Sequence, residues 1–165
     1  MFHKFRWTPQ KIAQRIQLIE PLVYRQQQPI PPFRFKSLGG PLENPPVGAE
    51  VDDSSWEVIQ PHSYWGTWLT DFVMRSEFAV PAHWDKNAPI GLYLPIGEAG
   101  DFSHPEGLTY IDGQTYASAD RHHHEVRLPA ELNDGKTHKL ALFGWTGRGG
   151  WTNGNPKTKL YMRDC

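Results

Sequence analysis

The sequence predicts a mostly β protein, an antiparallel β-sandwich of the jelly-roll kind with one N-terminal helix. From Trp56 onward, short segments of alternating apolar and polar residues recur, and dipeptides typical of tight turns separate them. No helical pattern lies between these segments, so we do not expect a βαβ arrangement. The predicted parts are an N-terminal helix over 1–25, a proline-rich connector over 26–55 and a β-sandwich domain over 56–165.

The predicted helix begins near Thr8, which can cap it, with Pro9 at the first helical position. Its apolar residues recur at spacings of four and three, which places them on one face: Ile12, Ile16 and Ile19. Pro21 is expected to end it. A helix of about 12 residues is marginal by itself in water, so we expect this one to dock on the following domain or to form an interface.

The connector is defined by its prolines and one glycine pair: Pro29, Pro31, Pro32, Pro41, Pro45, Pro46 and Gly39-Gly40. Proline removes a backbone donor and favours extended chain, so we expect neither a helix nor a central strand here. Phe33 and Phe35 are nevertheless expected to pack on the body.

The longest strand is expected within Thr67–Pro81, with Arg75 and Glu77 on its polar face. The apolar face of that strand carries Phe72, Met74, Phe78 and Val80, and a second apolar row carries Ile90, Leu92, Leu94 and Ile96. Asp112-Gly113 predicts a tight hairpin turn between Leu108–Asp112 and Gln114–Tyr116. Further strands are expected at Glu125–Leu128, His138–Phe143 and Lys159–Met162, with a turn at Asn133-Asp134-Gly135.

Composition narrows the possible partners and the location. The formal net charge is -1, which argues against nucleic acid as a partner. There is no apolar run of membrane-spanning length and no signal peptide at the N-terminus, so no membrane partner is expected. Cys165 is the one cysteine, so no intrachain disulfide can form. These features predict a cytoplasmic protein.

A polar cluster before the Glu125–Leu128 strand is the main candidate for contact with a ligand or a neighbouring domain. It consists of Asp120, Arg121, His122, His123 and His124. Because adjacent strand residues point to opposite faces, His122 and His124 can share a face while His123 points away. The alternatives at this point are an exposed polar turn, a sugar site and a metal site.

The metal alternative lacks the required spacing. Zinc needs converging ligands, and one histidine pair does not make a site. A cupin site needs a glutamate a few residues after the His-x-His pair, but this chain has Leu128 and Pro129 there. We therefore assign no metal ligand and no cofactor to this chain.

Exposed indole rings could stack on sugar rings, and Trp65 and Trp151 are the candidates for that role. Trp56 and Trp68 are expected to belong to the core. The glycine-rich run around Trp151 lacks the Gly-Lys-Ser/Thr sequence of a phosphate loop. Nothing in the sequence brings two carboxylates together across a glycosidic bond, so no catalytic residue is assigned.

Several ordered blocks resemble the N-terminal domain of glycoside hydrolase family 38 α-mannosidases, in particular the cytosolic or vacuolar branch. They are WEVIQPHSYWGTWLTDFVMRSEFAVP, PIGLYLPIG, PEGLTYIDGQTYASADRHHHEVRLP and DGKTHKLALFGWTG. The opening RIQLIEPLVYRQQQPIPPFRF resembles the helix and connector of those proteins, and the resemblance covers roughly Ile12 to Gly147.

The resemblance implies a galactose-binding-like β-sandwich ahead of a catalytic domain in the same polypeptide. That domain would carry a zinc ion and an aspartate nucleophile, and would hydrolyse α-mannosides with retention. The family's Gly-His-x-His-x-Asp type motif does not occur here, and the three consecutive histidines do not match it. We therefore expect an accessory domain of a longer enzyme, inactive as this chain alone. The alternatives are a stand-alone carbohydrate-binding module and a cupin-like metal-binding protein.

Overall fold

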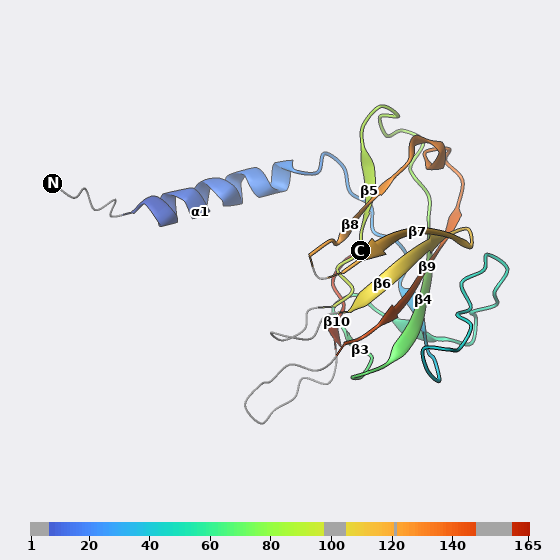
Figure 1. The fold of residues 1–165 in the computed structure, drawn as a ribbon. Helices are drawn as coiled ribbons and strands as arrows, with labels where there is room; N and C mark the ends of the chain where they lie inside the picture. Colours follow the sequence, from blue (N-terminus) through green and yellow to red (C-terminus); the bar gives the residue numbers. More distant parts are fainter. Residues whose placement is uncertain (1–6, 98–104, 121, 148–159) are drawn as a thin grey trace, which may run out of the picture.

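The computed structural model describes residues 7–97, 105–120, 122–147 and 160–165 (Figure 1). In this part of the chain the protein is mostly β, with one α-helix, α1 (Thr8–Ile19), and two short 3₁₀ turns, Glu20–Leu22 and Ala130–Leu132. The strands are β1 (Phe33–Ser37), β2 (Glu57–Ile59), β3 (Tyr64–Trp65), β4 (Asp71–Phe78), β5 (Ile90–Tyr93), β6 (Glu106–Ile111), β7 (Gln114–Ala119), β8 (Glu125–Leu128), β9 (His138–Trp145) and β10 (Leu160–Tyr161).

The strands form three antiparallel sheets that share one core. Six strands pair in the order β2-β1-β4-β9-β6-β7, and two ladders, β10–β3 and β5–β8, stand apart from them. Phe72 and Leu142 of the large sheet, Trp65 and Leu160 of one ladder and Val126 of the other belong to the same buried cluster. The arrangement is therefore sandwich-like, in agreement with the fold class that the sequence predicts.

The two faces of β4 differ from the prediction in one respect. Phe72, Met74 and Phe78 face the core as predicted. Arg75, on the opposite face, is only 2% exposed. Its guanidinium donates to Asp53 Oδ2 at 2.8 Å and to the carbonyl oxygen of Gly48 at 2.9 Å. Connector residues thus cover a strand face that was expected to meet solvent.

The connector also contains a strand that the proline content argued against. β1 lies between β2 and β4 in the six-stranded sheet, so the expectation that 26–55 holds no central strand is wrong. The physical reason is local: Phe33–Ser37 contains no proline, and its five residues retain their backbone donors. Phe35 packs against the core as expected, with its ring 5.7 Å from that of Trp65.

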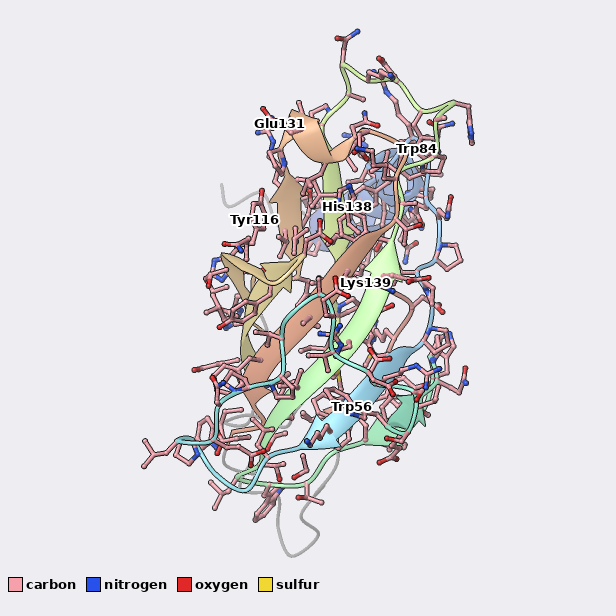
Figure 2. The ribbon with its side chains drawn as sticks, turned by 90° about the vertical axis from the view of Figure 1, so that its right-hand side faces the viewer. Trp56, Trp84, Tyr116, Glu131, His138 and Lys139 are labelled. Carbon is pink, nitrogen blue, oxygen red and sulfur yellow. The ribbon has the colours of Figure 1, made fainter. Side chains whose placement is uncertain are left out.

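The two turns that the sequence indicated are both present. Asp112 and Gly113 have φ angles of 50° and 79°, as a tight hairpin turn requires, and Gly135 has a φ angle of 77°. His138, at the start of β9, connects the two turns: its Nδ1 lies 2.7 Å from Asp112 Oδ2 and its Nε2 lies 3.1 Å from Asp134 Oδ1. Figure 2 shows His138 and Lys139 in succession on β9.

Helix α1 extends away from the β-sheets in Figure 1, and none of its residues is buried. It begins at Thr8 with a proline in its first turn, but Trp7 occupies the N-cap position, so Thr8 does not cap it. The α-helix ends at Ile19, before Pro21, as predicted. Among the helices of the described residues, none has both the length and the apolar character needed to cross a membrane.

Candidate functional site

The polar cluster at Asp120–His124 forms a turn between β7 and β8. Asp120 and His123 face each other as an isolated antiparallel bridge. The Asp120 carboxylate accepts hydrogen bonds from the backbone N–H of His122 at 2.7 Å and of His123 at 2.9 Å. The same carboxylate lies 2.9 Å from Nδ1 of the His123 ring. Arg121 lies outside the described residues.

These contacts fix the charge of Asp120. The hydrogen bond to His123, followed by that from the His122 N–H, lowers the pKa of Asp120 from 3.8 to about 2. A carboxyl group of that pKa is ionised at neutral pH, so Asp120 can accept hydrogen bonds but is a poor general acid. The His123 side chain is 73% exposed and remains accessible from solvent.

The same turn does not gather metal ligands. Within the described ranges, no group of three or more His, Cys, Asp or Glu side chains is placed to hold a metal ion. His124 instead packs against Tyr93, with the rings edge to face and their centroids 5.8 Å apart. No observation in this part of the chain favours the cupin-like alternative.

Two tyrosines extend the polar turn along the outer face of the β5–β8 ladder. Tyr93 of β5 is paired with Glu125 of β8, and Tyr24 donates a hydrogen bond from its hydroxyl to Glu125 Oε2 at 3.0 Å. The rings of Tyr24 and Tyr93 lie 6.4 Å apart. Burial and the bond to Glu125 both raise the pKa of Tyr24. We call this surface the tyrosine–histidine edge: Tyr24, Tyr93, Asp120, His123, His124 and Glu125.

The sequence placed only part of this edge. Asp120, His123 and His124 were predicted as contact residues, whereas Tyr24 and Tyr93 were not. Tyr93 alternates with the buried Leu92 and Leu94, a signal that would have placed it on the outer face. Tyr24 carries no such signal, because its contact with Glu125 spans 101 residues.

The tryptophan predictions require correction. Trp65 is only 1% exposed, and its indole N–H donates to the carbonyl oxygen of Ile96 at 2.6 Å. Neither of its faces is open to a sugar ring, so the stacking role predicted for Trp65 is wrong. Trp68 was expected in the core but is 37% exposed. Trp56 is partly buried beside the Lys36 ammonium group, and Trp151 lies outside the described residues.

A groove of about 220 Å³ lies elsewhere, between connector residues 28–31, the end of β4 and β5. Its lining is mainly apolar and includes Trp84, which Figure 2 shows at the end of the sheet opposite Trp56. Glu77, one of its few polar groups, is already bound to Lys139 Nζ at 2.7 Å. The groove therefore presents little chemistry for catalysis.

Comparison of the chain with known proteins finds no matching protein-family model and no matching curated protein.

Proposed function

We propose that this chain is the N-terminal accessory β-domain of a longer, cytoplasmic α-mannosidase and that the tyrosine–histidine edge docks on the catalytic domain. The resemblance described above supports the enzyme class. Its four blocks supply the strands β2 to β9, which contribute residues to one shared core. In this proposal, the zinc ion and the nucleophile belong to the catalytic domain.

The observation that carries the docking surface is the exposure of two contacting tyrosines beside a fixed carboxylate. Tyr93 is 44% exposed and Tyr24 is 40% exposed. Tyrosine is enriched at protein interfaces because it buries a large apolar ring while its hydroxyl keeps a polar partner. Asp120 adds an ionised acceptor whose orientation the turn already fixes.

Two of the described carboxylates, those of Asp112 and Asp120, already have hydrogen-bond partners. Asp112 binds His138 and the backbone N–H of Lys139, and Asp120 is engaged by its own turn. A glycosidase needs two carboxyl groups facing each other across the scissile bond. We therefore expect the chain of 165 residues to show no hydrolysis of 4-nitrophenyl α-mannoside by itself.

The first test is the reading frame that follows the Cys165 codon. A frame that continues into a domain with a Gly-His-x-His-x-Asp type motif is the expected result. A stop codon at that point would overturn the assignment to a longer enzyme.

The second test concerns the docking surface in the enzyme encoded by that frame. We expect Tyr93→Ala, and the pair Asp120→Ala with His123→Ala, to lower the melting temperature of the whole enzyme or its kcat/KM on 4-nitrophenyl α-mannoside. Val58→Ala is the control, because Val58 is 44% exposed on β2, at the outer edge of the six-stranded sheet and away from the β5–β8 ladder. Wild-type kinetics and stability in all the edge variants would rule out the docking role.

A further inference from the structure

A second exposed aromatic surface lies on the other ladder, β3–β10. Its members are Tyr64, Tyr161, His62 and Asp164, which we call the Tyr64 patch. We propose that the Tyr64 patch binds a neutral hexopyranose unit of a saccharide, with the sugar ring stacked on Tyr64. The Tyr64 patch lies on a different ladder from the tyrosine–histidine edge, and sugar binding there does not depend on the proposed function.

The aromatic part of the patch is a pair of tyrosines on a ladder whose inner face packs in the core. Tyr64 and Tyr161 are direct cross-strand partners, and their rings meet edge to face with centroids 5.0 Å apart. On the inner side of the same ladder, Trp65 is paired with Leu160 in the core. Tyr64 is nevertheless 60% exposed. The contact with Tyr161 restricts the Tyr64 ring, and a restricted ring loses less side-chain entropy when it binds a ligand.

Strand alternation explains why Tyr64, and not Trp65, presents the ring. Adjacent residues of a strand point to opposite faces, so burial of the Trp65 indole directs Tyr64 outward. The sequence predicted Trp65 as the stacking residue here and did not predict Tyr64.

Polar groups adjoin this pair of tyrosines. His62 Nε2 lies 2.9 Å from Asp164 Oδ2, and the His62 ring lies 6.3 Å from that of Tyr161. The Tyr161 hydroxyl is 3.5 Å from His62 Nδ1. The His62 and Asp164 side chains are 59% and 73% exposed, so their polar atoms can reach a bound molecule.

The backbone of His62 adopts a conformation that non-glycine residues rarely take. His62 has a φ angle of 61°, in the left-handed region, and its N–H donates to the carbonyl oxygen of Met162 at 2.8 Å. A non-glycine residue in that region costs about 1 kcal/mol, and such residues gather at ligand sites. The cost is met here at a position that brings the imidazole beside Tyr161 and Asp164.

This combination of groups fits a sugar. A pyranose ring presents C–H groups on its face and hydroxyl groups on its rim. The face of Tyr64 can take the C–H groups, the Asp164 carboxylate can accept from hydroxyls, and the imidazole and phenol can donate or accept. A formal net charge of -1 on the whole chain gives no attraction for a polyanionic ligand.

The test is a titration of the whole 165-residue chain, followed by ¹H–¹⁵N NMR. The probes are the methyl α-pyranosides of mannose, glucose and galactose, and a linear mannotriose. We expect at least one probe to shift the backbone amides of 62–65 and 160–164, with a Kd of about 1 mM. The absence of shifts with every probe up to about 50 mM would overturn the proposal.

Variants separate the Tyr64 patch from other surfaces. Tyr64→Ala should weaken binding at least about tenfold, whereas Tyr64→Trp should keep it because it restores a flat ring. Tyr93→Ala, on the tyrosine–histidine edge, is the matched control and should bind like the wild type. Far-UV circular dichroism verifies that each variant is folded. Unchanged binding by a folded Tyr64→Ala, or shifts centred on Tyr93, would overturn the proposal. Neither result would bear on the docking role, which the kinetics and melting temperature of the whole enzyme test.

Discussion

His138 is buried between two carboxylates, and this placement governs its charge. Burial by itself would lower its pKa, but the hydrogen bonds to Asp112 and Asp134 and their negative charges outweigh burial, so the pKa of His138 rises above 6.5. The pKa of Asp112 falls despite burial, chiefly through its bond to His138, and that of Asp134 falls to about 2, chiefly through the N–H of Lys136. When His138 is protonated, its imidazolium forms ion pairs with Asp112 and Asp134 and so links the β6–β7 and β8–β9 connections.

This arrangement predicts a pH window for stability. The raised pKa of His138 adds stability fully below pH 6.5, which is lost as pH rises through the folded pKa. The lowered pKa values of Asp112 and Asp134 add stability above pH 3.8, which is lost as pH falls through their folded values. His138→Gln should thus lower the unfolding free energy by about 1 kcal/mol more at about pH 5 than at about pH 9, as measured by urea denaturation. His83→Gln controls for the loss of a histidine, and an equal cost at both pH values would contradict the prediction.

Gly144 on β9 is required for close approach of the strands. It lies opposite Phe72 on one side and Gly107 on the other. A methyl group there would collide with the carbonyl oxygen of Glu106 and come within 2.8 Å of the Phe72 ring. Gly144→Ala should lower the unfolding free energy by about 2 kcal/mol, whereas Gly40→Ala, with no atom within 4 Å of its added methyl, should change it by less than about 0.5 kcal/mol. Equal effects in chemical denaturation would refute this account.

Among the elements, those with strong local patterns were predicted and those that depend on distant partners were not. β4, β5 and the β6–β7 hairpin follow from alternation and from Asp112-Gly113. β1 was not predicted, because the prolines on both sides of this five-residue segment indicated a connector without strands. Its pairing with β4 is a long-range contact that local pattern does not reveal. The cover over Arg75 was missed for the same reason, since Asp53 lies 22 residues away.

Helix α1 is an element whose stability contribution can be tested directly. The exposed fractions of Ile12, Ile16 and Ile19 are 52%, 56% and 59%, so the helix buries almost no apolar surface. Removal of 1–22, which keeps Tyr24 and its bond to Glu125, should shift the melting temperature by less than about 2 °C. The measurement is thermal denaturation followed in the near ultraviolet, where Trp65 reports on the core. A larger fall would mean that the helix docks on the β-sheets in solution.

At the scale of the whole molecule, the sequence predicted the mostly β, antiparallel class and the location of the polar turn. It could not show which aromatic rings are exposed around that turn. Tyr24 reaches the tyrosine–histidine edge from outside the β-sheets, and Tyr161 reaches the Tyr64 patch from the far end of the chain. Both surfaces combine residues about 100 positions apart, as the separations of Tyr24 from Glu125 and of Tyr161 from His62 show.

The C-terminal segment packs on the β-sheets and forms a hydrogen bond with the proline-rich connector. The N–H of Ile30 donates to the carbonyl oxygen of Cys165 at 3.1 Å, and Cys165 Sγ lies 3.8 Å from the sulfur of Met162, which is 1% exposed. Burial, and to a smaller degree the charge of Asp164, raises the pKa of the Cys165 thiol to about 12. Because the thiolate is the reactive form, the folded protein should protect this thiol.

Labelling of Cys165 therefore reports on opening of the whole body. At about pH 8, reaction with a disulfide reagent such as DTNB should be at least about a hundredfold slower in native buffer than in denaturant, because the raised pKa of this partly buried thiol leaves little thiolate in the folded protein. Since this is the one cysteine of the chain, the signal needs no correction for other thiols. Gly144→Ala should accelerate native-state labelling, because it destabilises the core that Leu160 and Met162 of the C-terminal segment share with the six-stranded sheet, whereas Gly40→Ala should leave the rate unchanged. Rapid labelling of the wild type, or equal rates in the two glycine variants, would show that the C-terminal segment opens independently of the core.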